Sequence, residues 1–397
     1  MKVACVGGGP ASLYFSILMK RADPSHEITI YERNPAGSTY GWGVTYWDEL
    51  LNSLHRADPE SASTISANSV RWDNWVVHVH DRTTVELEQS DEGYGIGRRE
   101  LLAILAERAR SLGVRIEYER EITGEDDLAD ADLVAGCDGV TSALRERHAD
   151  HFGTKVAVGR NLYIWLGTTK IFDAFTFAFV DTEHGWIWCY GYGFGNEHST
   201  CVIECAPATW KGLGLDRANE AHSLAILEKL FTNLLEGHPL IGRSGPDGKA
   251  HWLNFRTLTN RTWYRDNLVL LGDAAHTTHY SIGAGTALAL GDAAFLVQAL
   301  HSETQLQSAL ARYERERMSS IRFTQRAAHY SARWYENLSR YISLPPSQMC
   351  ALLGQRHSPV LPLVPPRLYY QMDQAAEWLA SKVIRPPKEE SRSSDHA

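Results

Sequence analysis

The chain opens with a short apolar run that breaks abruptly at three consecutive glycines. Residues 2–6 predict a buried strand, and residues 11–21 carry apolar side chains at helical spacing. A second apolar run with alternating isoleucines follows at residues 27–32 and predicts another strand. The order of strand, glycine turn, helix and strand restricts this part of the chain to a βαβ unit in a parallel sheet.

The glycine turn has the residue types that a dinucleotide pyrophosphate requires. Gly7 permits a tight turn, and Gly9 lets the backbone approach an anion at the helix N-terminus, where free N–H groups and the helix dipole favour negative charge. Glu32 ends the second strand, where a carboxylate can accept ribose hydroxyls. Ser12 replaces the third glycine of the usual pattern. The predicted dinucleotide contacts are Gly7, Gly9, Pro10, Ala11, Ser12, Glu32 and Arg33.

Composition excludes several other classes of protein. The 397 residues are 44% hydrophobic and 22% charged, with a formal charge of −9, which argues against binding to nucleic acid. No apolar run approaches the ~20 residues that span a bilayer, so no membrane segment is expected. The six cysteines form no Cys-x-x-Cys pair, which predicts free buried thiols and a cytoplasmic location.

The middle of the chain has a different periodicity. Residues 175–180, 185–193 and 199–205 alternate with period two, which predicts an antiparallel sheet. Helical patterns at 98–112, 285–300 and 304–338, and a strand at 267–271, lie on either side of it. The expected fold class is α/β (α+β), with a Rossmann-like nucleotide-binding domain interleaved with a β-sheet substrate domain and followed by a helical C-terminus.

We expect the following boundaries. The nucleotide-binding domain comprises residues 1–70, 95–160 and 262–300, and the substrate domain comprises 71–94 and 161–261. Residues 301–384 form the helical region, and the polar residues 385–397 a disordered tail.

Two further motifs identify the dinucleotide by resemblance. Residues 136–145, Gly-Cys-Asp-Gly-Val-Thr-Ser-Ala-Leu-Arg, resemble a nucleotide-binding segment of the group A flavin monooxygenases, the family of para-hydroxybenzoate hydroxylase. Residues 271–276, with Gly-Ala-Gly at 283–285, resemble the segment in which an aspartate holds the flavin ribityl chain. The resemblance implies FAD, with NAD(P)H as a transient cosubstrate because no second dinucleotide unit is present. The contacts that it implies are Trp42, Gly43, Val44, Arg98, Asp138, Gly139, Gly272, Asp273, Gly283, Ala284 and Gly285.

A closer resemblance covers nearly the whole chain. Residues 41–44, 165–170, 172–177, 203–205 and 279–283 resemble the branch of this family that includes salicylyl-CoA 5-hydroxylase and the monooxygenase part of 2-aminobenzoyl-CoA monooxygenase/reductase. This resemblance implies oxygenation by O₂ of an electron-rich aromatic acid, often presented as a CoA thioester. A monomer or homodimer is expected.

The sequence departs from the wider family where the flavin ring is expected. The usual proline is Tyr280, so His279 and Tyr280 become candidates for catalytic contact, while His276 is expected to stabilise the glycine loop. Tyr190 is a third catalytic candidate, because alternate residues 186–192 are aromatic and share one strand face. That face could be a pocket wall or simply core.

Other functions stay open at this point. Tyr280 leaves room for epoxidation or dioxygenation of a dearomatised or seven-membered, tropone-type ring thioester in natural-product (antibiotic) biosynthesis. A flavin halogenase and a non-catalytic FAD-binding protein are further alternatives. No metal site is expected, because His78 and His80 have no third ligand at metal spacing.

Overall fold

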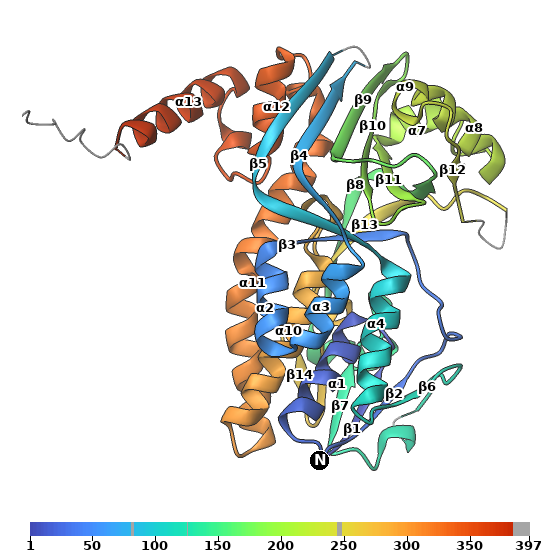
Figure 1. The fold of residues 1–397 in the computed structure, drawn as a ribbon, viewed down its shortest axis with the longest axis vertical. Helices are drawn as coiled ribbons and strands as arrows, with labels where there is room; N and C mark the ends of the chain where they lie inside the picture. The colour runs from blue at the N-terminus through green and yellow to red at the C-terminus, as the bar shows by residue number, and fades with distance from the viewer. Residues whose placement is uncertain (81–82, 125, 244–247, 384–397) are drawn as a thin grey trace, which may run out of the picture.

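The computed structural model describes residues 1–80, 83–124, 126–243 and 248–383 (Figure 1). Two sheets lie at opposite ends of the molecule, and one long helix, α11 (Leu306–Glu336), runs beside both. The last helix, α13 (Pro366–Val383), projects away from the body. The predicted disordered tail at 385–397 lies outside the described residues.

The first sheet is the expected parallel one, with an antiparallel pair of strands at one edge. Its central strand β1 is flanked in parallel by β2 and β7, which confirms the βαβ unit. In spatial order its strands are β14 (Tyr264–Arg265), β15 (Leu268–Leu270), β7 (Leu133–Gly136), β1 (Lys2–Val6), β2 (Glu27–Tyr31) and β6 (Arg115–Glu117). Around it lie α1 (Pro10–Ala22), α2 (Asp48–Ala57), α3 (Pro59–Ala67), α4 (Arg98–Ser111), α5 (Ala143–Arg147), α6 (Ala149–Phe152) and α10 (Gly285–Ser302).

The second sheet contains the predicted antiparallel strands. In spatial order they are β12 (Leu240–Ile241), β8 (Lys155–Thr168), β11 (Ser199–Cys205), β10 (Gly185–Gly193), β9 (Phe175–Thr182), β4 (Val70–Val79), β5 (Thr83–Gly97) and β3 (Gly43–Trp47), with β13 (Leu253–Thr259) also paired to β8. Strands β4 and β9 run parallel, and the other pairs are antiparallel. Strand β3 follows the first βαβ unit in sequence but pairs with β5, so it ties the two sheets together.

The two faces of the second sheet are covered differently. On one face, Ile187, Cys189 and Cys201 pack with α7 (Pro207–Gly212), α8 (Glu220–Leu230) and α9 (Thr232–Leu235). All six cysteines are buried and free, as predicted. On the other face, the aromatic side chains of β10 pack with the end of α11 and with α12 (Pro346–Gly354). No helix in the described ranges is long and apolar enough to cross a membrane.

The aromatic face is therefore largely core. Trp188 is 2% exposed, and its ring stacks on Tyr335 of α11 at a centroid distance of 5.7 Å. Tyr190 and Tyr192 are also buried. Tyr280 is the partly exposed member of this cluster that belongs to the nucleotide-binding segments. The sequence left open whether this face is a pocket wall or core, and the structure places Trp188 in the core.

We predict that Trp188→Ala lowers the free energy of unfolding by ~3–5 kcal/mol, because it removes a large buried ring and leaves a cavity against α11. Thermal unfolding of the purified protein measures this. Phe323→Ala is the matched control. Phe323 is an aromatic residue of α11, the helix that carries Tyr335, but it is 78% exposed. Equal melting temperatures for the two variants would contradict the assignment of Trp188 to the core.

Candidate active site

The β1–α1 loop is shaped by one close approach. Gly7 has φ of 102°, and a Cβ at that position would lie 2.3 Å from the carbonyl oxygen of Cys137. Only glycine fits, so the loop packs directly on the end of β7. A Cβ on Gly9 would meet nothing within 4 Å, and no side chain caps the helix that begins at Pro10. The first N–H groups of α1 thus have no side-chain cap, and the backbone at Gly9 is open to close approach, which suits a pyrophosphate.

Ser12 and Glu32 hold this loop from two sides. The Ser12 hydroxyl is buried and donates to the carbonyl oxygen of Gly7 at 2.5 Å. The Glu32 Oε2 accepts from the N–H of Gly8 at 2.6 Å, and Oε1 accepts from the N–H of Asn34 at 2.8 Å. Ser12 thus supports the loop from inside. Glu32 Oε2 retains a lone pair that suits a ribose hydroxyl. Arg33 is exposed at the strand end.

The turn at Gly272 is fixed by a fully buried carboxylate. Asp292 accepts from the Gly272 N–H at 2.8 Å and from His276 Nε2 at 2.9 Å, and its other oxygen accepts from Arg317 Nε at 2.7 Å. Burial disfavours the charge, but His276 and Arg317 hold the pKa of Asp292 below its ordinary value. The contact confirms that His276 stabilises the glycine loop. Arg317 was missed, because nothing in its own helix distinguishes it from surface arginines.

Arg98 and Asp273 present opposite charges from two different segments. The Arg98 N–H donates to the carbonyl oxygen of Trp42 at 2.8 Å, and its buried Nε has no partner among the described residues. Burial lowers the pKa of Arg98, and Asp273 opposes that change. Burial likewise raises the pKa of Asp273, although the residue is still exposed to solvent. A polar cofactor would satisfy both groups.

The Asp138–Gly139 motif is joined to the same turn. Asp138 Oδ2 accepts from the N–H of Ala143 at 2.7 Å, while its buried Oδ1 has no partner in the described ranges. Gly139 has φ of 81° and open space where a side chain would stand. The buried Arg145 donates to the carbonyl oxygens of Val140, at 2.7 Å, and Ala274, at 3.1 Å. One guanidinium therefore fixes the spacing of two motifs that lie far apart in the sequence.

Trp42, Gly43 and Val44 lie against the second sheet. The Gly43 N–H donates to Thr200 Oγ1 at 2.9 Å, and its carbonyl oxygen accepts from the Tyr192 hydroxyl at 2.8 Å. A Cβ on Gly43 would lie 2.6 Å from the Phe194 ring, so close packing explains this glycine. Val44 is buried in β3.

The Gly283–Gly285 segment forms the second uncapped helix start. Gly283 has φ of 63°, and a Cβ there would lie 2.5 Å from Thr45 Oγ1. Helix α10 begins at Gly285 without a side-chain cap at Ala284, and Gly285 is exposed to open space. The backbone N–H groups at this end suit an anionic group.

The three catalytic candidates lie together. The rings of His279 and Tyr280 are 4.2 Å apart between centroids, and those of Tyr190 and Tyr280 are 5.9 Å apart. His279 Nδ1 accepts from the N–H of Ser281 at 3.4 Å, and burial lowers its pKa to about 3. His279 is therefore neutral at physiological pH, and with Nδ1 as acceptor its proton is on Nε2.

Glu204 is the functional residue that the sequence did not single out. It is 1% exposed on β11, and it accepts from the Tyr280 hydroxyl at 2.5 Å and from Asn161 Nδ2 at 2.7 Å. Burial raises its pKa to about 7, against the effect of those two hydrogen bonds. The sequence did contain a signal for Glu204, which is an acid between two apolar residues of a predicted buried strand. In the structure Glu204 lies opposite Trp188 in the neighbouring strand.

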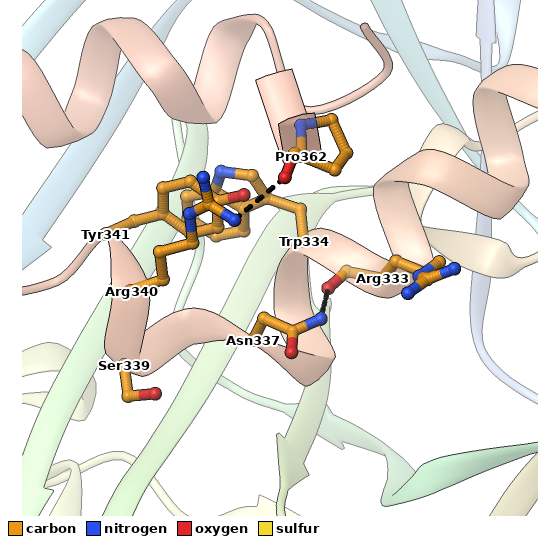
Figure 2. Close-up of a pocket in the computed structure, with 7 residues that line it drawn as sticks. All are labelled: Arg333, Trp334, Asn337, Ser339, Arg340, Tyr341 and Pro362. Carbon is orange, nitrogen blue, oxygen red and sulfur yellow. Dashed lines mark hydrogen bonds between the residues drawn. The ribbon is translucent and has the colours of Figure 1, made fainter. Parts of the chain in front are cut away.

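A hollow of about 260 Å³ lies at the C-terminal end of α11. Figure 2 shows Arg333, Trp334 and Arg340 around it, with Arg340 donating to the carbonyl oxygen of Pro362 at 2.8 Å. Two other cations of the second sheet and its covering helices lie away from this hollow. Lys170 pairs with Glu236, and Lys211 is on α7, over the opposite face of the sheet. Nor does the described part of the chain group three potential metal ligands.

The residues present fit FAD. The nucleotide end has an uncapped helix start at Gly9 and a carboxylate at Glu32. The middle has Asp273 beside the unpaired Nε of Arg98, and the far end has the uncapped start of α10. All lie on elements of the first sheet or on its links to the second.

Comparison with known proteins supports this fit. A family model described as FAD binding domain matches residues 1–328. Salicyloyl-CoA 5-hydroxylase of a Streptomyces species is 36% identical over 354 residues, which cover 86% of this chain and 66% of that relative. The 3-hydroxy-4-methyl-anthranilyl-[aryl-carrier protein] 5-monooxygenase of Streptosporangium sibiricum is 34% identical over 338 residues, which cover 85% of this chain and 90% of that protein.

A solved structure has the same fold. The tetrameric form of 2-methyl-3-hydroxypyridine-5-carboxylic acid oxygenase superposes with a TM-score of 0.67 at 18% identity, covering 86% of this chain and 92% of that one.

We predict that Asp273→Ala weakens FAD binding roughly 10–100-fold, because a hydrogen bond to a charged group contributes ~1.5–3 kcal/mol. The ratio of flavin to protein absorbance after gel filtration measures the retained FAD. Asp130→Ala is the control, since that side chain is 89% exposed at the far end of the first sheet. Full FAD retention after loss of both Asp273 and Glu32 would show that the site is assigned wrongly.

The raised pKa of Glu204 predicts a pH dependence of stability. The folded pKa of about 7 exceeds the ordinary 4.5, so the stabilisation of the protonated form is complete below about pH 4.5 and is lost as pH rises through 7. This loss is up to ~3 kcal/mol. Glu204→Gln should remove this pH-dependent loss of stability. The melting temperature of the variant should therefore rise relative to that of wild type as the pH increases from 5 to 8. Glu197→Gln, at an exposed turn, should track wild type. A constant difference between Glu204→Gln and wild type would refute the raised pKa.

Proposed function

The chain belongs to the FAD binding domain family of flavoprotein monooxygenases, and from that membership we propose that it oxygenates an electron-rich aromatic acid held as a thioester, with NAD(P)H and O₂ as cosubstrates. The observation that carries the proposal is the combination of three cofactor-type features, at Gly9, Asp273 and Gly285, with the aromatic cluster of Tyr190 and Tyr280, whose Tyr280 leads directly into the last of them.

The chain's own residues have separable tasks in this reaction. The free N–H groups after Gly9 would hold the pyrophosphate, and Asp273 and Arg98 the middle of the cofactor. FAD supplies the redox chemistry, taking electrons from NAD(P)H and delivering them to O₂. The uncapped start of α10 at Gly285 places backbone donors where negative charge develops.

The second sheet supplies the substrate side of the site. Tyr280 stands between the rings of Tyr190 and Tyr163, at 5.9 and 4.5 Å, so a planar ring would meet an aromatic surface there. Closely packed rings exclude water from the reacting position. His279, kept neutral by burial, can donate a hydrogen bond from Nε2 but carries no charge.

The thioester is proposed from the relatives' substrates. Salicyloyl-CoA and an aryl group on a carrier protein both present an aromatic acid on a phosphopantetheine-type arm. Arg333, which lines the hollow shown in Figure 2, is the cation we propose for the phosphorylated arm. These relatives do not favour epoxidation or dioxygenation of a seven-membered ring. We also propose a cytoplasmic monomer or homodimer, which the six free buried thiols support for location alone.

We predict that the CoA thioester of an aromatic acid stimulates NAD(P)H oxidation and coupled product formation far more than the free acid does. Binding energy from the remote arm can orient the ring at the flavin and raise turnover as well as affinity. Matched assays with salicylate and salicylyl-CoA, following NADH loss and hydroxylated product, measure this. Equal coupled turnover of both would rule out thioester recognition. Oxygen use that yields only hydrogen peroxide with both would place the substrate in another class.

A further inference from the structure

Glu204 and Tyr280 form a hydrogen-bonded pair across the junction of the two sheets. Glu204 belongs to β11 of the second sheet, and Tyr280 begins the short 3-10 helix (Tyr280–Ile282) that leads into Gly283 and α10. The Tyr280 hydroxyl donates to Glu204 Oε2 at 2.5 Å. The pair therefore joins the predicted substrate side of the site to the predicted flavin side.

The two members differ in their access to a ligand. Glu204 is 1% exposed, and its second oxygen is occupied by Asn161 at 2.7 Å. Tyr280 is partly exposed, although four aromatic rings lie within 6 Å of its own. Because Glu204 is closed off, a ligand beside this cluster would meet Tyr280 first, and the Tyr280 hydroxyl has lone-pair capacity left after donating to Glu204.

The surroundings decide which member titrates. Burial, and then the charge of Glu204, raise the pKa of Tyr280 far above its usual range, so Tyr280 stays protonated. Burial, with a smaller contribution from Glu336 of α11, raises the pKa of Glu204 to about 7. Its other ionisable neighbours are Tyr163 on β8, Tyr190 on β10, Cys205 on β11 and Tyr335 on α11. Burial raises the pKa of each of these four, which therefore remain neutral near pH 7 and leave Glu204 as the acceptor.

We propose that Glu204 is the proton acceptor for an acidic ring hydroxyl of the substrate, with Tyr280 passing the proton between them. In this step the substrate O–H proton moves to Tyr280 Oη while the Tyr280 proton moves to Glu204 Oε2. The substrate becomes a phenolate and Glu204 a neutral acid, so the total charge of the site is unchanged. The proposal rests on the proposed function, because a phenolate ring is the better nucleophile for oxygenation.

The step predicts that the enzyme keeps a proton when it ionises a ligand. The test uses FAD-loaded enzyme without NAD(P)H, with 5-nitrosalicylate and its CoA thioester as probes, because the nitrophenolate absorbs visibly. We expect wild type at pH 8 to show the phenolate band on binding, with the phenolic proton retained by the complex. An unbuffered pH measurement counts that proton.

The variants separate a proton acceptor from a structural bond. Glu204→Gln keeps the side-chain shape but cannot accept a proton. Its amide has one acceptor oxygen, so one of the two present donors, Tyr280 or Asn161, must turn to accept from the new NH₂ group. It should raise the pH midpoint of the bound phenolate by at least about one unit, a tenfold change in the ionisation constant. Where a phenolate band still appears in this variant, the proton lost by the phenol should be released to solution. Tyr280→Phe should give the same shift with Glu204 intact. Tyr335→Phe, the same change in the same cluster, should behave as wild type, because no described residue bonds to the Tyr335 hydroxyl and its ring stacks on the core residue Trp188.

Three results would overturn the inference. The first is a Glu204→Gln or Tyr280→Phe variant that retains FAD and has the same phenolate pH midpoint and the same number of retained protons as wild type. Another is wild type that binds the probes only as neutral phenols, and the third is wild type that binds neither probe. A variant that loses FAD would instead assign the pair to structure. Because no turnover is involved, the proposed oxygenase activity stands or falls separately, on NAD(P)H oxidation with the thioester.

Discussion

The buried carboxylate of Asp292 is the constraint on which the rest of the site depends. One side chain holds the Gly272 N–H, the imidazole of His276 and the guanidinium of Arg317, and so joins the end of β15 to helices α10 and α11. An unpaired carboxylate in this position would cost several kcal/mol, but here each oxygen has a charged or N–H partner. Asp273 takes its position from the same turn. The cofactor contacts and the cover of the aromatic face are therefore positioned by one hydrogen-bond network.

Local sequence pattern predicted much of this arrangement. The glycine run between a strand and a helix was sufficient for the first βαβ unit, because Gly7 is required by its contact with Cys137. Period-two alternation located the strands of the second sheet, and the family resemblance located Arg98, Asp138 and Asp273. These features are set by residues within one element or one turn, where spacing in sequence fixes spacing in the fold.

What the sequence could not predict depends on contacts between distant segments. Trp188 belongs to the core because Tyr335 stacks on it, and no pattern within β10 reports a partner nearly 150 residues away. Glu204 is an acceptor because Tyr280 and Asn161 meet it in three dimensions. Strand β3 likewise pairs with β5 and not with the unit that precedes it. In each case the deciding term is burial or a hydrogen bond, which requires the tertiary structure.

Helix α11 gives the molecule a mechanical property. Its 31 residues extend about 46 Å at 1.5 Å per residue. Near its middle Arg317 binds Asp292 at the cofactor turn, and near its end Tyr335 stacks on the aromatic sheet. A rigid rod fastened at both sheets prevents them from opening like a hinge, because any rotation would break a buried ion pair or a stacked ring. Entry of substrate and exit of product must therefore proceed by small movements of loops and side chains within a frame of constant shape.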